Sequence, residues 1–507
     1  MNGSQDRLKK TETVFCMLTG ILCLMALFML FYITIKGTYY TPMDDSLQYQ
    51  SDFIPWNILA IIIFLMIFSY VCKATGGMKE RIIIAAAVIT EFLVCCLWIR
   101  ISHVMPQVDQ NTLCDAAMQF NSGDFNKLAR DGYVNEFRQQ LGFITFLRMI
   151  FLISGGRNYW IVQYINAAAA AAILFCNGRI AETLGESRHA KTNGVLLSFF
   201  AYPILFYTAF VYGELISTAL YLLIVLEVLS LLKKFQWKKC IIAGLAMGVA
   251  VQLRENILIA LIAIVICLLF RAVSVKSRTA LMVAGSLIIG TIGLQMMTNQ
   301  IYASHFTEGT GSMPASLHIA MGMMDGEYGP GWYNDYNRQT FRKNNYDVQA
   351  ADQEAKAAIR TRMQYFKEHP SEMQTFYYTK ISTQWNNPMY ESILLNNMFY
   401  SEPVGFAYEI YYGDMERPID IFMNYFQGFV YFMMLLYLIY MVRHKAGMEY
   451  YIIPLTVLGG FLFSILWEAK SRYVFPYFVM MLPCAAVMID KINRRIGPDP
   501  ADVRLGT

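Results

Sequence analysis

Charged side chains are scarce in this sequence of 507 residues. Lysine, arginine, aspartate and glutamate make up 15% of the chain, whereas hydrophobic residues make up 56%. A soluble domain of ordinary composition carries about 25% charged residues. The scarcity therefore argues against a soluble protein, and the small net charge of +4 gives no sign of a nucleic-acid partner.

Several motifs of well-known chemistry are also missing. The sequence has no Walker A loop and no Gly-x-Ser-x-Gly nucleophile elbow, and its six histidines include no His-x-x-x-His pair. Nine of the ten cysteines lie in or beside apolar stretches, which leaves Cys114 alone in a loop without a partner for a disulfide. These absences argue against ATP-driven transport, hydrolysis at a nucleophile elbow and a disulfide framework.

The apolar residues are collected in long blocks. Residues 14–36, 54–73, 82–101 and 420–442 each have about the ~20 residues needed to cross ~30 Å of hydrocarbon. The first block is too long for the apolar core of a signal peptide and lacks a clear small-x-small cleavage site. The fold class predicted is an all-α polytopic membrane protein.

Lysine and arginine cluster in short segments, and such segments mark the cytoplasmic side. They are 7–10, 73–81, 233–239, 271–278, 443–445 and 491–495. These segments fit about twelve spans with both termini in the cytoplasm. The apolar stretch 141–154 is too short to cross and is expected to be re-entrant or interfacial.

In this topology the remaining polar groups gather on the extracytoplasmic face. They are Asp109 and Asp115, the turn 212–214, the pair Arg254 and Glu255, and the segment 467–472. The chain divides into an N-terminal transmembrane region (1–300) with its first outer loop at 103–140, a mixed or helical outer segment (301–418), C-terminal transmembrane helices (419–493) and a cytoplasmic tail (494–507).

Asp109 follows an apolar stretch directly. One interpretation is a helix cap, in which Asp109 helps to start a helix over residues 113–120. The other is a general base, because a carboxylate at the membrane edge can take the proton of a hydroxyl that meets a lipid-anchored donor. The sequence leaves both interpretations open.

Basic residues stand at the ends of other outer helices. Arg254 interrupts an apolar stretch, where it either forms a helix-end pair with Glu255 or binds a lipid phosphate or pyrophosphate. Lys470 and Arg472 are placed to do the same or to anchor a helix at the headgroups. Glu214 is expected to hold a basic group such as Arg254 or to face water.

The outer segment is rich in aromatic residues. Trp332, Tyr333 and Trp385 give this otherwise polar stretch an unusual density of aromatic side chains.

A pattern of short stretches runs along most of the chain. It consists of Val108-Asp109-Gln110, Cys114-Asp115-Ala116-Ala117, Gly123-Asp124-Phe125, Gln139-Gln140-Leu141-Gly142-Phe143, Phe210-Val211-Tyr212-Gly213-Glu214, Gly331-Trp332-Tyr333-Asn334, Gln384-Trp385-Asn386 and Leu466-Trp467-Glu468-Ala469-Lys470-Ser471-Arg472-Tyr473. In these stretches the sequence resembles the GT-C integral-membrane glycosyltransferases, specifically the bacterial relatives of the protein O-mannosyltransferases and aminoarabinose transferases (glycosyltransferase family 39-like).

The resemblance implies a polyprenyl-phosphate-linked sugar as the donor, at the outer face of the cell membrane, and a glycan, lipid or protein as the acceptor. It implies Asp109 as the catalytic base and Arg254, Lys470 and Arg472 as the residues that bind the donor phosphate. Asp115 and Glu214 are expected as supporting acids. Trp332, Tyr333 and Trp385 would hold an acceptor sugar or polymer by stacking on its apolar faces, or they would form a lid that shields the site. The mannosyltransferases pair adjacent acids where this chain has Asp109 and Gln110, which weakens the case for a required metal. A divalent cation stays open, and no other cofactor is implied.

The reaction that follows is a single displacement, which inverts the anomeric carbon. Three rival functions stay open. A lipid-linked-sugar flippase should thread polar residues through its spans, a polymer ligase would use a lipid-linked glycan as donor, and a non-catalytic assembly protein would tolerate Asp109→Asn.

Overall fold

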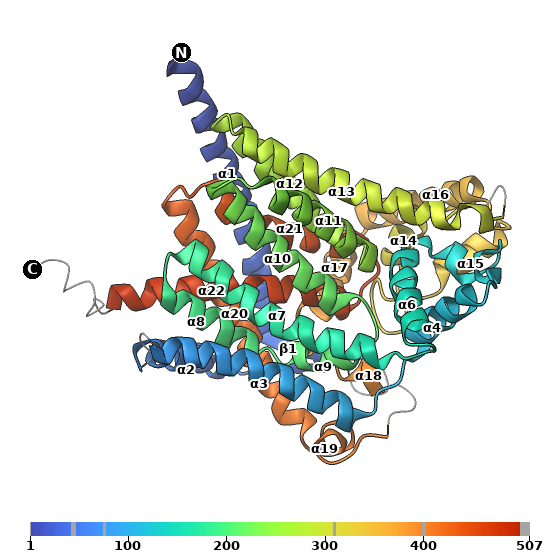
Figure 1. The fold of residues 1–507 in the computed structure, drawn as a ribbon, viewed down its shortest axis with the longest axis horizontal. Coiled ribbons are helices and arrows are strands. Elements are labelled where there is room, and N and C mark those ends of the chain that lie inside the picture. The colour runs from blue at the N-terminus through green and yellow to red at the C-terminus, as the bar shows by residue number, and fades with distance from the viewer. Residues whose placement is uncertain (1, 42–46, 75–77, 308–310, 398–401, 497–507) are drawn as a thin grey trace, which may run out of the picture.

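The computed structural model describes residues 2–41, 47–74, 78–307, 311–397 and 402–496, and most of them are helical (Figure 1). Within these ranges ten helices are long and apolar enough to cross a membrane. They are α1 (Asn2–Lys36), α2 (Ile54–Ala74), α3 (Met78–Ser102), α7 (Trp160–Gly185), α10 (Glu214–Lys233), α12 (Ile257–Ser274), α13 (Arg278–Tyr302), α20 (Glu416–Arg443), α21 (Ile452–Leu466, with the turn 448–451 before it) and α22 (Phe475–Ile496). The chain is therefore a multi-pass α-helical membrane protein.

Shorter helices complete the bundle. The helices α8 (Arg188–Phe199) and α9 (Pro203–Phe206) pass the same test only as a pair that bends by 56°, which would make an eleventh span. The helix α11 (Trp237–Leu253) has 17 residues and α6 (Leu141–Ile153) has 13. At about 1.5 Å per residue, α6 is only about 20 Å long, which agrees with the expectation that it does not cross. The predicted number of about twelve spans stays a prediction.

Helix α22 runs through the middle of the bundle, where its side chains are nearly all buried (Figure 1). Small residues bring other helices together. The helix α11 packs closely on α13, and a Cβ added at Gly290 would lie 2.2 Å from the carbonyl oxygen of Gly244. Such close contacts are typical of small-residue faces in membrane helices, where association depends on van der Waals packing. In α7, Ala167, Ala169 and Ala170 are buried in the same way.

The outer segment 301–418 packs over one end of the bundle. Its helices are α14 (Ala315–Gly322), α15 (Tyr336–Lys343), α16 (Val348–Glu368), α17 (Pro370–Trp385), α18 (Leu394–Asn397) and α19 (Phe406–Tyr412). Apolar side chains of α14, α15 and α16 form a small core of their own around Leu317, Phe341 and Ala355. The connection 37–53, for which no structure was expected, forms a hairpin of β1 (Gly37–Tyr40) and β2 (Gln48–Ser51).

The two ends of the bundle differ. The connections that follow α10, α12 and α20, together with the last turn of α22, lie at the end that we call the basic end (Figure 1). The opposite end carries α4 (Val108–Asn121), α5 (Tyr133–Glu136), α6 and α14–α16, and we call it the cavity end. The tail at 497–507 lies outside the described residues.

Candidate functional site

A cavity of about 460 Å³ lies at the cavity end, where helix ends meet the outer segment. It is lined by Gln107, Asp109, Tyr133, Tyr212, Arg254, His318, Trp332, Tyr333, Arg338, Glu468, Lys470, Arg472 and Tyr473, among others. The cavity therefore brings together Asp109, all three predicted phosphate-binding residues and two of the predicted aromatic residues. These predicted residues lie up to 363 positions apart in the sequence, from Asp109 to Arg472.

Asp109 lies in the first turn of α4 and does not cap it. The N-cap residue is Gln107, and its side chain makes no capping hydrogen bond. The helix also begins at Val108, five residues before the start that the sequence suggested. Val108 has a φ of 45°, a left-handed conformation that is costly for a β-branched residue. The interpretation of Asp109 as a helix cap is therefore wrong.

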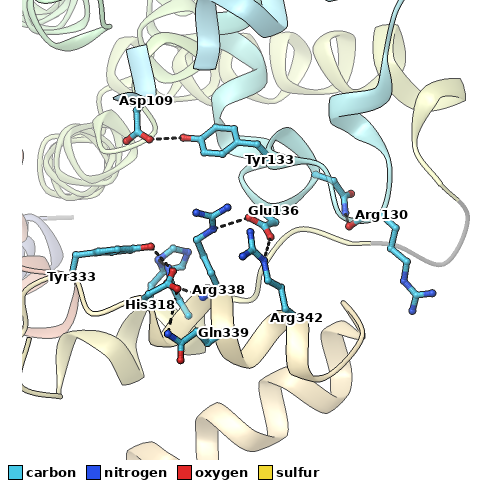
Figure 2. A network of polar contacts seen from close by, with 12 residues as sticks. Asp109, Arg130, Tyr133, Glu136, His318, Tyr333, Arg338, Gln339 and Arg342 are labelled. Atoms are coloured by element: carbon cyan, nitrogen blue, oxygen red, sulfur yellow. Dashed lines mark hydrogen bonds and ion pairs between the residues drawn. The ribbon is translucent and has the colours of Figure 1, made fainter. Parts of the chain in front are cut away.

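The carboxylate of Asp109 accepts a hydrogen bond from the hydroxyl of Tyr133, with 3.2 Å between the two oxygens (Figure 2). Tyr133 belongs to α5, in a stretch that the sequence did not place. Burial and the nearby Tyr212 and Asp109 raise the pKa of Tyr133, so this phenol keeps its proton and remains a donor. The bond engages Oδ1 and leaves Oδ2 to meet another group.

Two contacts fix the backbone near the start of α4 and the start of α10. The side-chain oxygen of Gln110 accepts a hydrogen bond from the backbone N–H of Val211 at 2.7 Å, which ties α4 to the segment before α10. A Cβ at Gly213 would lie 2.3 Å from the carbonyl oxygen of Leu253, so only glycine lets the start of α10 approach the end of α11. This close approach sets Glu214 beside Arg254.

Arg254 ends α11 and forms an ion pair with Glu214 rather than with its chain neighbour Glu255. The distance between Nη2 and Oε1 is 3.1 Å, and the exposed fractions of the two side chains are 14% and 2%. The guanidinium also lies 5.0 Å from the ring centre of Tyr212. Glu214 thus stands behind Arg254 and holds it at the cavity wall.

Arg472 and Lys470 belong to the segment between α21 and α22. The guanidinium of Arg472 lies 5.8 Å and 5.2 Å from the ring centres of Tyr212 and Tyr473, and its buried Nε has no hydrogen-bond partner. Burial alone would lower the pKa of Arg472, but Tyr473, Tyr212, Glu214 and Asp109 together raise it. Lys470 lies over the ring of Trp332, with Nζ 5.9 Å from the centre.

Glu468 is a second carboxylate in the cavity, and we did not predict it as a site residue. It accepts a hydrogen bond from the hydroxyl of Tyr473 at 3.3 Å. Burial raises the pKa of Glu468, although Lys470 and Arg472 act in the opposite direction. Its position in the polar segment 467–472 was the signal that could have found it.

The loop 326–332 forms part of the wall. Gly331 has a φ of 77°, and its carbonyl oxygen accepts a hydrogen bond from the N–H of Ala469 at 2.7 Å. Trp332 is buried and donates from Nε1 to Thr383. Beneath the loop, Lys380 donates to the carbonyl oxygens of Gly322 and Ile465, and burial lowers its pKa to about 7. These contacts fasten the outer segment to the segment that carries Lys470 and Arg472.

Arginines of α15 form the outer part of the wall. The fully buried carboxylate of Glu136 accepts from Nε of Arg338 at 3.0 Å and from Nε of Arg342 at 3.2 Å (Figure 2). Arg338 lines the cavity, whereas Arg342 is not among the residues that do. The hydroxyl of Tyr333, also at the cavity, donates to Asp335 at 2.6 Å.

Two further side chains line the cavity without having been predicted. Both amide atoms of Gln107 are buried and have no hydrogen-bond partner. His318 stacks on Trp467 with 4.7 Å between ring centres, and burial lowers its pKa to about 4. A buried amide without a partner is expensive, and such groups call for an explanation such as a bound ligand.

Two predicted supporting residues lie elsewhere. Asp115 does not line the cavity and pairs with Arg157 at 2.6 Å. Trp385 is buried among the membrane helices, where Nε1 donates to Ser464 at 2.9 Å, so it is not placed to stack on a sugar in this cavity. Among the described residues no group of three or more histidine, cysteine or acidic side chains is arranged to hold a metal ion.

The chain matches no model of a known protein family, and a search of curated proteins also finds no match.

Proposed function

We propose that the protein is a membrane glycosyltransferase that moves a sugar from a polyprenyl-phosphate donor to a cell-envelope acceptor. The observation that carries this proposal is the single cavity that holds Asp109, Arg254, Lys470 and Arg472 at the ends of the apolar helices. A carboxylate and three cations at the edge of the hydrocarbon are what a lipid-anchored phosphate leaving group requires. The GT-C-like fold, and the placement of this cavity at the extracytoplasmic face, are part of the same proposal.

The donor phosphate would bind the cations. Arg254 is held by Glu214, and Arg472 is a permanent cation whose Nε has no protein partner. A guanidinium can bind a phosphate with two parallel hydrogen bonds, which a lysine cannot do. The tail of the donor would extend toward the lipid, since these residues lie at helix ends.

Asp109 would then act as the base. Its Oδ2 takes the proton of the acceptor hydroxyl, and the acceptor oxygen forms a bond to the anomeric carbon. The bond from that carbon to the phosphate oxygen breaks, and the electron pair stays on the phosphate, where Arg472, Arg254 and Lys470 stabilise it. One displacement of this kind inverts the anomeric configuration. Tyr133 keeps the carboxylate oriented through Oδ1.

The test is a reconstituted assay of the purified protein in proteoliposomes. A panel of polyprenyl-phosphate sugars is supplied with a cell-envelope extract, with and without EDTA, and release of polyprenyl phosphate is measured. We expect release with one donor, and a product of inverted configuration. Movement of intact donor across the bilayer without release would favour the flippase instead, and release only from a lipid-linked glycan would favour the polymer ligase.

A further inference from the structure

Two arginines pair with Glu136, so two positive charges face one negative charge. One buried carboxylate accepts from both Arg338 and Arg342, so the cluster keeps one excess positive charge. Arg342 alone would neutralise Glu136. Arg338 therefore adds a charge that its ion pair does not require, and it is the arginine of the two that lines the cavity.

The guanidinium of Arg338 is also oriented for a ligand. Glu136 accepts from Nε, and the hydroxyl of Tyr333 is in hydrogen-bond contact with the same side chain. A guanidinium has four further donors on its two Nη atoms, arranged in a planar fork that fits phosphate and carboxylate groups. Arg338 is held by Glu136 and Tyr333, and 28% of its side chain remains exposed where it lines the cavity.

Resting on the proposed function, we propose that Arg338 forms a second anion subsite, which binds a phosphate or carboxylate group of the acceptor. The cavity already offers Arg254, Lys470 and Arg472 to the donor phosphate, and all three stand at the ends of membrane helices. Arg338 belongs to α15, in the outer segment at the cavity end of the bundle (Figure 1), and it lies beside Glu136 (Figure 2). A membrane-anchored donor reaches the first group, and an acceptor that arrives from water meets the second.

The experiment is calorimetric titration of the purified full-length protein with farnesyl phosphate present at saturation, so that the donor cations are occupied. The titrants are glucose 6-phosphate, glucuronate and glucose. We expect at least one of the two anionic sugars to bind about 10-fold or more tightly than glucose, and the two anions show which group is preferred. Equal affinity for all three sugars in the wild type, or binding of none, would overturn the proposal.

Variants separate binding from structure. Arg338→Gln should abolish the preference for the anion, whereas Arg338→Lys should keep part of it. The matched control is Arg342→Gln, which breaks the other ion pair of Glu136 and should keep the full preference. Equal losses in Arg338→Gln and Arg342→Gln would mean that Arg338 is only structural, which contradicts the subsite.

These titrations need no turnover. Preference for the anion without release of polyprenyl phosphate from any donor would contradict the proposed function and leave the anion site itself in place. Release of polyprenyl phosphate without any preference for an anionic sugar would overturn the subsite alone.

Discussion

At the basic end of the bundle, the ion pairs of Arg271 with Glu449 and of Lys239 with Glu227 lie near the surface, and every one of these side chains is at least 27% exposed. The exception there is Asp490, a fully buried carboxylate that pairs with Arg494. At the cavity end the carboxylates of Glu214 and Glu136 are 2% and 0% exposed, and each holds an arginine at the cavity wall. Gln107 and Nε of Arg472, at the same end, are buried without partners.

Exposed ion pairs and buried polar groups without partners differ in what they contribute to the free energy of folding. A surface ion pair contributes about 0–1 kcal/mol, so the exposed pairs at the basic end change the free energy of folding little. A buried polar group without a partner costs about 1–3 kcal/mol. Gln107 and Nε of Arg472 are groups of the second kind at the cavity, where a ligand would complete the bonds that the protein leaves open. Other buried atoms without a hydrogen-bond partner, such as the hydroxyl of Tyr451 and Nδ2 of Asn493, lie away from the cavity.

The largest expected effect separates two acids of the same helix. Asp109→Asn removes the proposed base, so release of polyprenyl phosphate should fall about 1,000-fold. Asp115→Asn changes an acid of α4 that pairs with Arg157 outside the cavity, and release should stay within about threefold. Similar losses in both variants would show that α4 matters only as a structural element.

A second comparison uses one arginine from each end. Arg472→Gln should lower kcat for release about 100-fold, because the leaving phosphate loses a cation that stabilises it. Each tenfold change in kcat corresponds to about 1.4 kcal/mol of activation free energy. Arg271→Gln, which breaks an ion pair at the basic end, should change kcat less than twofold. If Arg472→Gln raised KM and left kcat unchanged, the residue would bind substrate without stabilising the leaving group.

Two buried glutamines sharpen the distinction between function and stability. The amide of Gln163 in α7 donates to the carbonyl oxygens of Val104 and Ala209, so Gln163→Leu should lower the free energy of unfolding by about 2–4 kcal/mol. Gln107→Leu removes an amide without partners and should leave the melting temperature unchanged or higher, while kcat/KM falls about 10-fold. Loss of stability in Gln107→Leu, measured by thermal unfolding in detergent, would mean that the amide is satisfied by the protein.

The last prediction concerns pH and bears on stability alone. The pKa of His318 is lowered to about 4 in the fold, whereas a histidine in an unfolded chain titrates near 6.5. Between these pH values the unfolded state binds more protons, so acidification from about 6.5 to 4 should lower the free energy of unfolding by a few kcal/mol. Above pH 6.5, His318 adds no pH dependence to the free energy of unfolding. His318→Phe keeps a ring beside Trp467, and its melting temperature should fall less over the same range than that of the wild type.

Much of the fold could be predicted because long apolar blocks fix their own structure in a membrane. Local signals also account for helix α16, because Asp347 caps its start and Pro370 stands two residues beyond its end. The hairpin at 37–51 was not, because its register depends on contacts with residues far along the chain, such as the bond from the N–H of Tyr39 to the carbonyl oxygen of Asn386.

The cavity shows a similar limit. The position of a residue relative to the basic segments was enough to group Asp109, Arg254, Lys470 and Arg472. The sequence left the partner of Arg254 open between Glu255 and Glu214, and the structure shows the pair with Glu214, across two helices. The Glu136 cluster was missed because it joins residues about 200 positions apart, and no local pattern marks such a contact.

The most direct test of the account is a structure by cryo-electron microscopy of the protein in a lipid nanodisc with a bound polyprenyl phosphate. We predict that the phosphate lies in the cavity, within about 4 Å of the guanidinium of Arg472 and close to Arg254 and Lys470, as an ion pair requires. A phosphate bound at the basic end, with the cavity occupied only by water, would contradict the central claim.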